Sequence, residues 1–235
     1  KGTRINDTPI HKRNLGMIFQ NYALFPHKTI FDNVAFGLKY RDVPKETIKE
    51  KVTRALEMVR LPGVENRMPS QLSGGQQQRI AMARAIVIEP DVLLMDEPFS
   101  NLDVELRERL SVEVRDLLKS EGISGILVTH DQHEAFAVSD KVGVMRDGRI
   151  LQWDTPYNLY HQPNERFVAD FIGQGRFIAG VVRTPETFET ELGTLHGNPS
   201  CAQSVGTRVE ILPGLGPYHE SVRLDRSQVY AFTGV

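Results

Sequence analysis

The sequence contains very little cysteine, no long apolar run and almost no excess of charge. Cys201 is the single cysteine among 235 residues, which excludes an internal disulfide and favours a reducing cytoplasm. No stretch approaches the ~20 apolar residues of a membrane-spanning helix, so we expect membrane association only through a partner protein. The net charge of -2 gives no electrostatic footprint for nucleic acid, and we expect no nucleic-acid partner.

A further absence is the lysine-bearing glycine loop that holds the phosphates of a nucleotide. The sequence has instead "LSGGQQQR" at 72–79, a glycine pair behind a serine where a helix is expected to begin. Two glycines in a helix cost ~1 kcal/mol each relative to alanine. Backbone N–H groups that approach an anion at a helix N-terminus would explain them. The alternative is an ordinary N-capped helix with a flexible start.

Short apolar runs alternate with helical patterns over the first 140 residues. Strand-like runs occupy 15–20, 91–97 and 125–130, and helical periodicity covers 44–61, 74–88, 103–122 and 131–139. Continuous apolar strands suit a parallel sheet that is covered on both faces. A hairpin is expected at 141–153, because Asp147-Gly148 separates two strand-like runs. The pattern predicts a doubly wound α/β fold, with ligand sites at the carboxyl ends of the strands.

The composition and the periodicity of the sequence change after residue 172. Nine of the 19 glycines lie in 173–235, and helical periodicity is lost there. We therefore predict two domains, an α/β domain at 1–172 and a small β-rich, barrel-like domain at 173–235. The second domain is short for a complete barrel, and residues are expected to be missing near Pro213. The chain begins in turn-like sequence without a methionine, so we also expect a strand to precede it in the natural protein.

Two carboxylates follow the apolar run "VLLM" at 92–95. Asp96 and Glu97 then lie at a strand end, together with Gln20 and His130 from the neighbouring predicted strands. One carboxylate in such a place can hold a Mg²⁺ shell, and the next can orient or deprotonate a water. The alternative is a strand that simply ends in solvated acids. The neighbouring "PFSNLD" and "LSGGQQQR" favour the phosphoryl-transfer interpretation.

With these motifs in place, the chain resembles the nucleotide-binding subunits of ABC transporters, which have a P-loop NTPase-like fold. "LSGGQQQR" is similar to the family signature, "VLLMDE" to the Walker B strand and "VTHD" at 128–131 to the switch-histidine loop. "NLD" at 101–103 is similar to the D-loop, and Gln20 to the Q-loop glutamine. Five motifs in the family's order cover residues 15–131.

The resemblance implies ATP and Mg²⁺ as cofactors and a role for each motif residue. Glu97 would be the general base, Asp96 would support Mg²⁺, and His130 would contact the γ-phosphate. Gln20 would contact metal or water and report to the membrane subunit, and Asp103 would lie at a dimer interface. In this family the signature contacts the nucleotide of a second copy in a head-to-tail homodimer; the residues concerned here are Ser73, Gly74, Gly75 and Gln76.

The family's Walker A loop, "GxxGxGK[ST]", has no counterpart in these 235 residues. No other segment supplies its lysine and its cluster of backbone N–H donors. We therefore expect the isolated chain to bind Mg-ATP no better than millimolar and to hydrolyse none, although the natural protein is expected to be an ATPase. Isothermal titration of the chain beside its natural parent tests this, and micromolar binding by the chain would contradict it.

The C-terminal extension is similar to the regulatory, TOBE-like domains of bacterial importers. The implied partners are transmembrane permease subunits and, indirectly, a substrate-binding protein, at the cytoplasmic face of the inner membrane. The junction "FIGQGRFIAGVV" is most similar to the ferric-iron branch of these importers, and this resemblance implies ferric iron as the substrate. Polyamine, sulfate and phosphonate importers are the alternatives. A soluble ABC ATPase without a membrane partner is the alternative class. Against it stands the aromatic-rich 21–38 segment, which in importers receives a permease helix.

Overall fold

The computed structural model describes residues 4–41, 43–173, 180–184, 187–190, 193–196, 208–209 and 229–234. The chain divides into two compact units. The first comprises Lys1–Ser139 and Leu224–Ala231, and the second comprises Asp140–Arg223 and Phe232–Val235. The predicted domain boundary after residue 172 stays a prediction. In the described part of the chain, no helix combines the length and apolar character that crossing a membrane requires.

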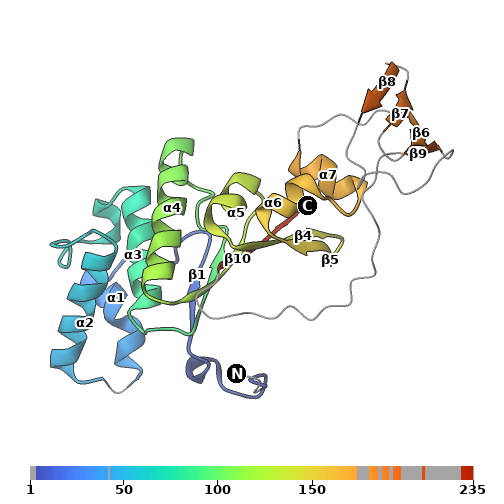
Figure 1. The fold of residues 1–235 in the computed structure, drawn as a ribbon. Helices are drawn as coiled ribbons and strands as arrows, with labels where there is room; N and C mark the ends of the chain where they lie inside the picture. The colour runs from blue at the N-terminus through green and yellow to red at the C-terminus, as the bar shows by residue number, and fades with distance from the viewer. Residues whose placement is uncertain are drawn as a thin grey trace. The chain divides into compact units, whose positions relative to one another are not determined.

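A parallel sheet forms the centre of the first unit (Figure 1). Its strands β1 (Leu15–Ile18), β2 (Val92–Asp96) and β3 (Ser124–Val128) lie in the order β1-β2-β3, and β10 (Val229–Gly234) follows β3. All of β2 pairs with β3, from Val92 opposite Ser124 to Asp96 opposite Val128. The predicted α/β class with a parallel sheet is therefore confirmed. The carboxyl ends of the three strands meet at one edge of this sheet.

Five α-helices accompany the sheet in the first unit: α1 (Ile30–Lys39), α2 (Lys45–Met58), α3 (Gly74–Ile86), α4 (Val104–Ser120) and α5 (Gln132–Val138). Two short 3-10 helices, η1 (Ile10–Lys12) and η2 (Pro69–Gln71), precede β1 and α3. Helix α3 packs on β1 and on α1 and α2, and α4 packs on β3 and α5. The α3 N-terminus and the α4 N-terminus thus belong to helices that are anchored on different strands.

In the described residues, one face of the sheet is buried and the other is exposed at the carboxyl ends of its strands. Ile18, Leu93 and Leu127 on the first face are at most 1% exposed. On the opposite face Met17 and Val128 are 42% and 45% exposed. Successive side chains of a strand point to opposite faces, and Ser124, on the same face as Val128, is only 5% exposed. This second face is thus partly covered, and the expectation of helices on both faces stays a prediction.

The buried face of α4 also differs from the expected one. The periodic apolar positions predict an inner face of Leu106, Leu110, Val114 and Leu117. The structure buries Leu110, Ser111, Val114 and Leu118 and leaves Leu106 and Leu117 only half-buried. The face is rotated because α4 packs against α5 as well as β3, so two neighbours rather than one decide which side chains lose water.

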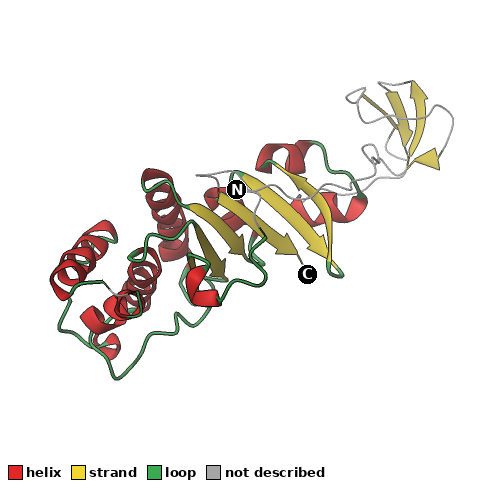
Figure 2. Ribbon diagram, turned by 90° about the horizontal axis from the view of Figure 1, so that it is seen from below, coloured by secondary structure: helices red, strands yellow, loops and turns green. Residues whose placement is uncertain are grey.

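The second unit contains the predicted hairpin and a small antiparallel sheet (Figure 2). Strands β4 (Lys141–Arg146) and β5 (Arg149–Asp154) pair across Asp147 and Gly148, whose φ values of 49° and 72° suit the tight turn. Helices α6 (Pro156–His161) and α7 (Arg166–Ile172) follow. The second sheet has the order β8-β7-β6-β9, formed by β6 (Gly180–Thr184), β7 (Thr187–Thr190), β8 (Gly193–His196) and β9 (Arg208–Val209). Cys201, Pro213 and any barrel closure lie outside the described residues.

Candidate functional site

Glu97 follows the last residue of β2 in an unusual backbone conformation. Its φ of +43° lies in the left-handed region, which costs a residue with a side chain about 1–3 kcal/mol. Hydrogen bonds to the Glu97 backbone fix this conformation. The Glu97 N–H donates to the Val128 carbonyl at 2.8 Å, and the Ser100 hydroxyl donates to the Glu97 carbonyl at 3.0 Å. The strained backbone therefore directs one carboxylate to a fixed place beside the sheet edge.

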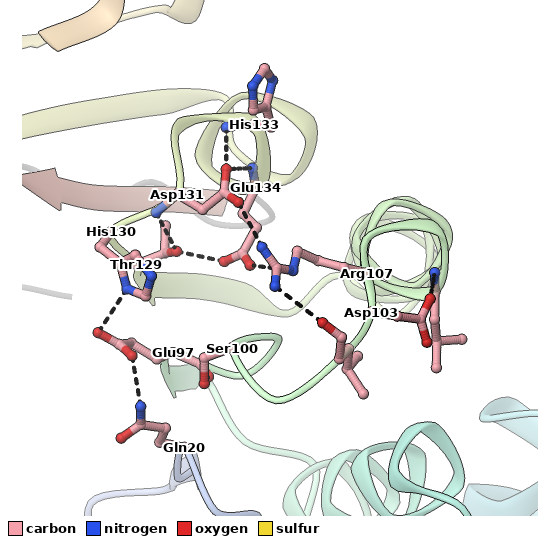
Figure 3. A network of polar contacts seen from close by, with 12 residues as sticks. Gln20, Glu97, Ser100, Asp103, Arg107, Thr129, His130, Asp131, His133 and Glu134 are labelled. Atoms are coloured by element: carbon pink, nitrogen blue, oxygen red, sulfur yellow. Dashed lines mark hydrogen bonds and ion pairs between the residues drawn. The ribbon is translucent and has the colours of Figure 1, made fainter.

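Three of the predicted site residues meet at that carboxylate (Figure 3). The Gln20 amide Nε2 donates to Glu97 Oε2 at 2.8 Å, and His130 Nδ1 lies 3.2 Å from Glu97 Oε1. The Glu97 side chain is 29% exposed and the His130 side chain is 66% exposed. Each residue follows the end of a different parallel strand, so the sheet places all three at one edge. The carboxylate remains open to a water or a ligand from solvent.

Asp96 ends β2 directly before this cluster and is exposed. Within the described residues, no group of three or more His, Cys, Asp or Glu side chains could hold a metal ion by themselves. Mg²⁺ usually takes only one or two protein carboxylates and completes its shell with phosphate oxygens and water. The Asp96 carboxylate and the Gln20 amide oxygen, which takes no part in the Glu97 bond, are oxygen donors of the kind that Mg²⁺ takes from a protein.

Arg84 and Asn101 hold the loop that carries Gln20. The sequence patterns did not single out Arg84, and they gave Asn101 only as the first residue of the D-loop-like "NLD". The Arg84 guanidinium donates to the carbonyls of Tyr22 and Ala23, each at 2.7 Å. These two residues have positive φ values of 60° and 45°, so the loop is held in a strained turn. Asn101 Nδ2 donates to the Gln20 carbonyl at 2.9 Å. One available signal was an arginine within the otherwise apolar run "IAMARAIVI".

A second polar network surrounds the backbone on both sides of His130 (Figure 3). Arg107, on α4, places Nη1 2.9 Å from Asp131 Oδ2 and Nε 3.5 Å from Glu134 Oε1. The Thr129 hydroxyl donates to Glu134 Oε2 at 2.5 Å and accepts from the Asp131 N–H at 3.0 Å. Asp131 also begins α5, because its Oδ1 accepts from the His133 N–H at 2.8 Å.

The pKa values of the two carboxyl groups in this network are shifted in opposite directions. Burial raises the pKa of Glu134, which is only 4% exposed, and the Thr129 hydrogen bond and Arg107 offset this in part. Burial also acts to raise the pKa of Asp131. The His133 N–H, the Arg107 guanidinium and the Glu134 N–H outweigh it, so the pKa of Asp131 is lowered. Asp131 is thus the stable anion that Arg107 balances, and Glu134 is the carboxyl that gives up its charge first as pH falls.

Replacing Glu134 by Gln is expected to change how stability depends on pH. The pKa of Glu134 in the folded chain is raised above its ordinary value of 4.5. Between that ordinary value and the pKa of the folded chain, the folded state binds more protons than the unfolded state. Wild-type stability, relative to Glu134→Gln, should therefore fall as pH rises from about 4.5 through the folded pKa. Thermal unfolding of both chains from pH 4 to pH 8 measures this, with the exposed Glu108→Gln as control. A difference that grows with pH would contradict it.

The start of α3 is organised by a capping box. The Ser73 hydroxyl accepts from the Gln76 N–H at 3.4 Å, and the Gln76 side chain accepts from the Ser73 N–H at 3.0 Å. A Cβ atom on Gly75 would lie 2.8 Å from Leu106 Cδ2, whereas one on Gly74 would have its nearest neighbour, Leu102 Cδ2, at 3.8 Å. Gly75 therefore also serves the close packing of α3 on the first turn of α4.

The predicted site residues form two groups rather than one. Gln20, Glu97 and His130 are joined by hydrogen bonds, with Asp96 adjacent. Asp103 caps α4 by accepting the Leu106 N–H at 2.9 Å, and it lies with Ser73–Gln76 beside Leu102 and Leu106. Among the described residues, no hydrogen bond or ion pair joins Ser73, Gly74, Gly75 or Gln76 to the Glu97 cluster.

Comparison with known proteins gives a family resemblance that agrees with this geometry. Residues 1–100 match the family model described as ABC transporter. The spermidine/putrescine import ATP-binding protein PotA of Clostridium novyi (strain NT) is 51% identical over 182 residues, which are 77% of this chain and 52% of that protein. The PotA protein of Acetivibrio thermocellus has the same identity and coverage. The chain thus spans about half the length of these curated relatives.

The names of these relatives can be compared with the expected transport substrate, ferric iron. Both are named for spermidine and putrescine import, so ferric iron finds no support in them, whereas the polyamine alternative does. Over its first 100 residues the chain is similar to the ABC transporter family, and over 182 residues it is similar to ATP-binding proteins of polyamine importers.

Proposed function

We propose that the natural protein is the ATP-hydrolysing subunit of a bacterial ABC importer and that its transported substrate is a polyamine. The cluster of Gln20, Glu97 and His130 at the ends of three parallel strands carries this proposal. The identity of 51% to two spermidine/putrescine import proteins supports the transport role and the substrate class. Polyamine import replaces ferric iron as the preferred interpretation.

In this proposal Glu97 activates the attacking water. Its Oε2 accepts from Gln20 and its Oε1 lies near His130 Nδ1, so the carboxylate is oriented before any ligand binds. Phosphoryl transfer needs positioning and charge stabilisation more than covalent help from the protein. His130 is exposed enough to donate a hydrogen bond to a terminal phosphate. Bound Mg²⁺, held in part by Asp96 and Gln20, would neutralise charge on the phosphates.

Ser73, Gly74, Gly75 and Gln76 serve the nucleotide of a second copy in this proposal. The start of α3 presents backbone N–H groups and the positive end of a helix, which suit an anion. Within the described residues no hydrogen bond or ion pair joins these groups to the Glu97 cluster, which is compatible with a site shared between two copies. Asp103, in the loop beside them, would then lie at the interface between the copies. The permease would recruit the subunit to the cytoplasmic face of the membrane.

Transport by the assembled complex tests the proposed function. The natural protein is copurified with its permease, reconstituted into proteoliposomes and supplied with ATP and labelled spermidine. ATP-dependent uptake of spermidine, with no uptake of ferric iron or sulfate under the same conditions, is the expected result. The Glu97→Gln complex is the matched control for ATP dependence. ATP hydrolysis without any copurifying membrane protein would favour the soluble ATPase class instead.

A further inference from the structure

Arg107 connects two loops that are far apart in the sequence. It lies one helical turn after Asp103, which caps α4, and its Nη2 donates to the Leu102 carbonyl at 3.1 Å. Its Nη1 contacts Asp131 at 2.9 Å, across 24 residues of sequence. The Arg107 side chain is 23% exposed, so most of these contacts are shielded from water. One guanidinium thus touches the loop of Asp103 and the residue after His130.

The position of His130 depends on its neighbours rather than on its own ring. The ring is 66% exposed, and within the described residues it contacts Glu97 at 3.2 Å. By contrast, Thr129 and Asp131 on either side are fixed through Glu134 and Arg107 (Figure 3). Glu134 is buried, and a buried carboxylate requires a counter-charge, which Arg107 provides at 3.5 Å.

We propose that Arg107 is a positioning residue: with Asp131 and Glu134 it fixes the backbone that carries His130 relative to the loop that carries Asp103. The planar guanidinium is suited to this role because its fork makes several directed bonds at once, which a lysine ammonium cannot reproduce. Contact of a second copy with the Asp103 loop would then set the distance between His130 and Glu97. The inference rests on the proposed ATP hydrolysis, which it extends to a link between the dimer interface and the switch histidine.

A double-mutant cycle tests the inference in the natural protein assembled with its permease. Arg107→Gln should lower the turnover number for ATP by roughly 10- to 100-fold, because it misplaces a group that contacts the reacting phosphate, and should leave the KM nearly unchanged. If Arg107 acts through His130, Arg107→Gln combined with His130→Ala should be no slower than His130→Ala alone. The proposal would be overturned if the turnover number of the double variant fell by the product of the two single-variant losses. Arg107→Lys is expected to restore only part of the turnover.

Arg115→Gln is the matched control. Arg115 also lies on α4 and also reaches α5, since its Nη1 donates to the Val138 carbonyl at 2.6 Å, but it contacts the end of α5 that is remote from His130. Arg115→Gln should retain turnover within about twofold of wild type. Equal losses in the two arginine variants would overturn the proposal. Should Arg107→Gln fail to fold, the paired variant Arg107→Gln/Glu134→Gln removes both buried charges and replaces it in the cycle.

Hydrogen exchange without nucleotide gives a readout that does not depend on activity. The N–H groups of Asp131, His133 and Glu134 are protected by Thr129 and Asp131 in the described network. Arg107→Gln should speed exchange in peptides covering 129–136, and Arg115→Gln should not. Unchanged exchange in Arg107→Gln would overturn the proposal even in an active protein. A wild-type protein that hydrolyses no ATP would instead overturn the proposed function. The exchange result alone would then decide the role of Arg107.

Discussion

Glu97→Gln is expected to lower ATP turnover of the natural protein by roughly 10²-fold or more, while ATP binding is kept. The glutamine retains the shape of the side chain. Its oxygen can still accept from Gln20, and its amide can donate to His130 Nδ1, so the geometry of the cluster is preserved. What is lost is a group able to take a proton from water. Steady-state hydrolysis assays and measurement of ATP trapped in persistent dimers check this.

The control for Glu97→Gln is Glu108→Gln, which removes an exposed glutamate from α4 without touching the cluster. It should hydrolyse ATP at the wild-type rate, and both variants should unfold at nearly the wild-type temperature. A Glu97→Gln protein that hydrolyses ATP at the wild-type rate would show that the water is activated elsewhere. The strained backbone at Glu97 would then need a different explanation.

Mixed dimers of Glu97→Gln with Gly74→Asp are expected to regain activity that neither parent dimer has. If the α3 N-terminus serves the nucleotide of the partner copy, one composite site of the mixed dimer carries both defects and the other carries none. The intact site should restore up to about half of wild-type turnover, against losses of roughly 10²-fold in each homodimer. Coexpressed, differently tagged copies and hydrolysis assays on the purified mixed dimer measure this.

The choice of Gly74 follows from the packing around the glycine pair. A side chain on Gly75 would press on Leu106 within the same chain, so Gly75→Asp also disturbs the α3–α4 contact. Gly74 has more room, and an aspartate in the first turn of a helix is compatible with folding. The added negative charge would repel a phosphate. Should the mixed dimer be as inactive as its parents and trap no ATP, the assignment of Ser73–Gln76 to the partner's nucleotide fails.

Local sequence patterns were sufficient for the three parallel strands, the hairpin, helices α2 to α5 and the residues at the strand ends, whereas α1, α6, α7 and β10 were not predicted. Apolar runs followed by Gln20, Asp96, Glu97 and His130 predicted strands with polar residues at one edge, and β1, β2 and β3 have this arrangement. The Asp147-Gly148 turn and the α3 cap at Ser73 were also predicted from the sequence. Turn and cap geometries depend on a few adjacent residues, so a short window of sequence contains the information.

Tertiary packing decided which side chains are buried and which residues support the site, and a short window of sequence does not contain this information. Three features depend on residues distant in sequence: the rotated buried face of α4, the exposure of Met17 and Val128 on the sheet, and the support of the site by Arg84 and Arg107. A salt bridge such as that of Arg107 with Asp131 leaves no periodic signal, because each charge alone is typical of a solvated helix surface. The sequence by itself therefore determined which side chains gather at the sheet edge. Only the folded chain determined how they are held, since buried charges must find partners wherever the fold places them.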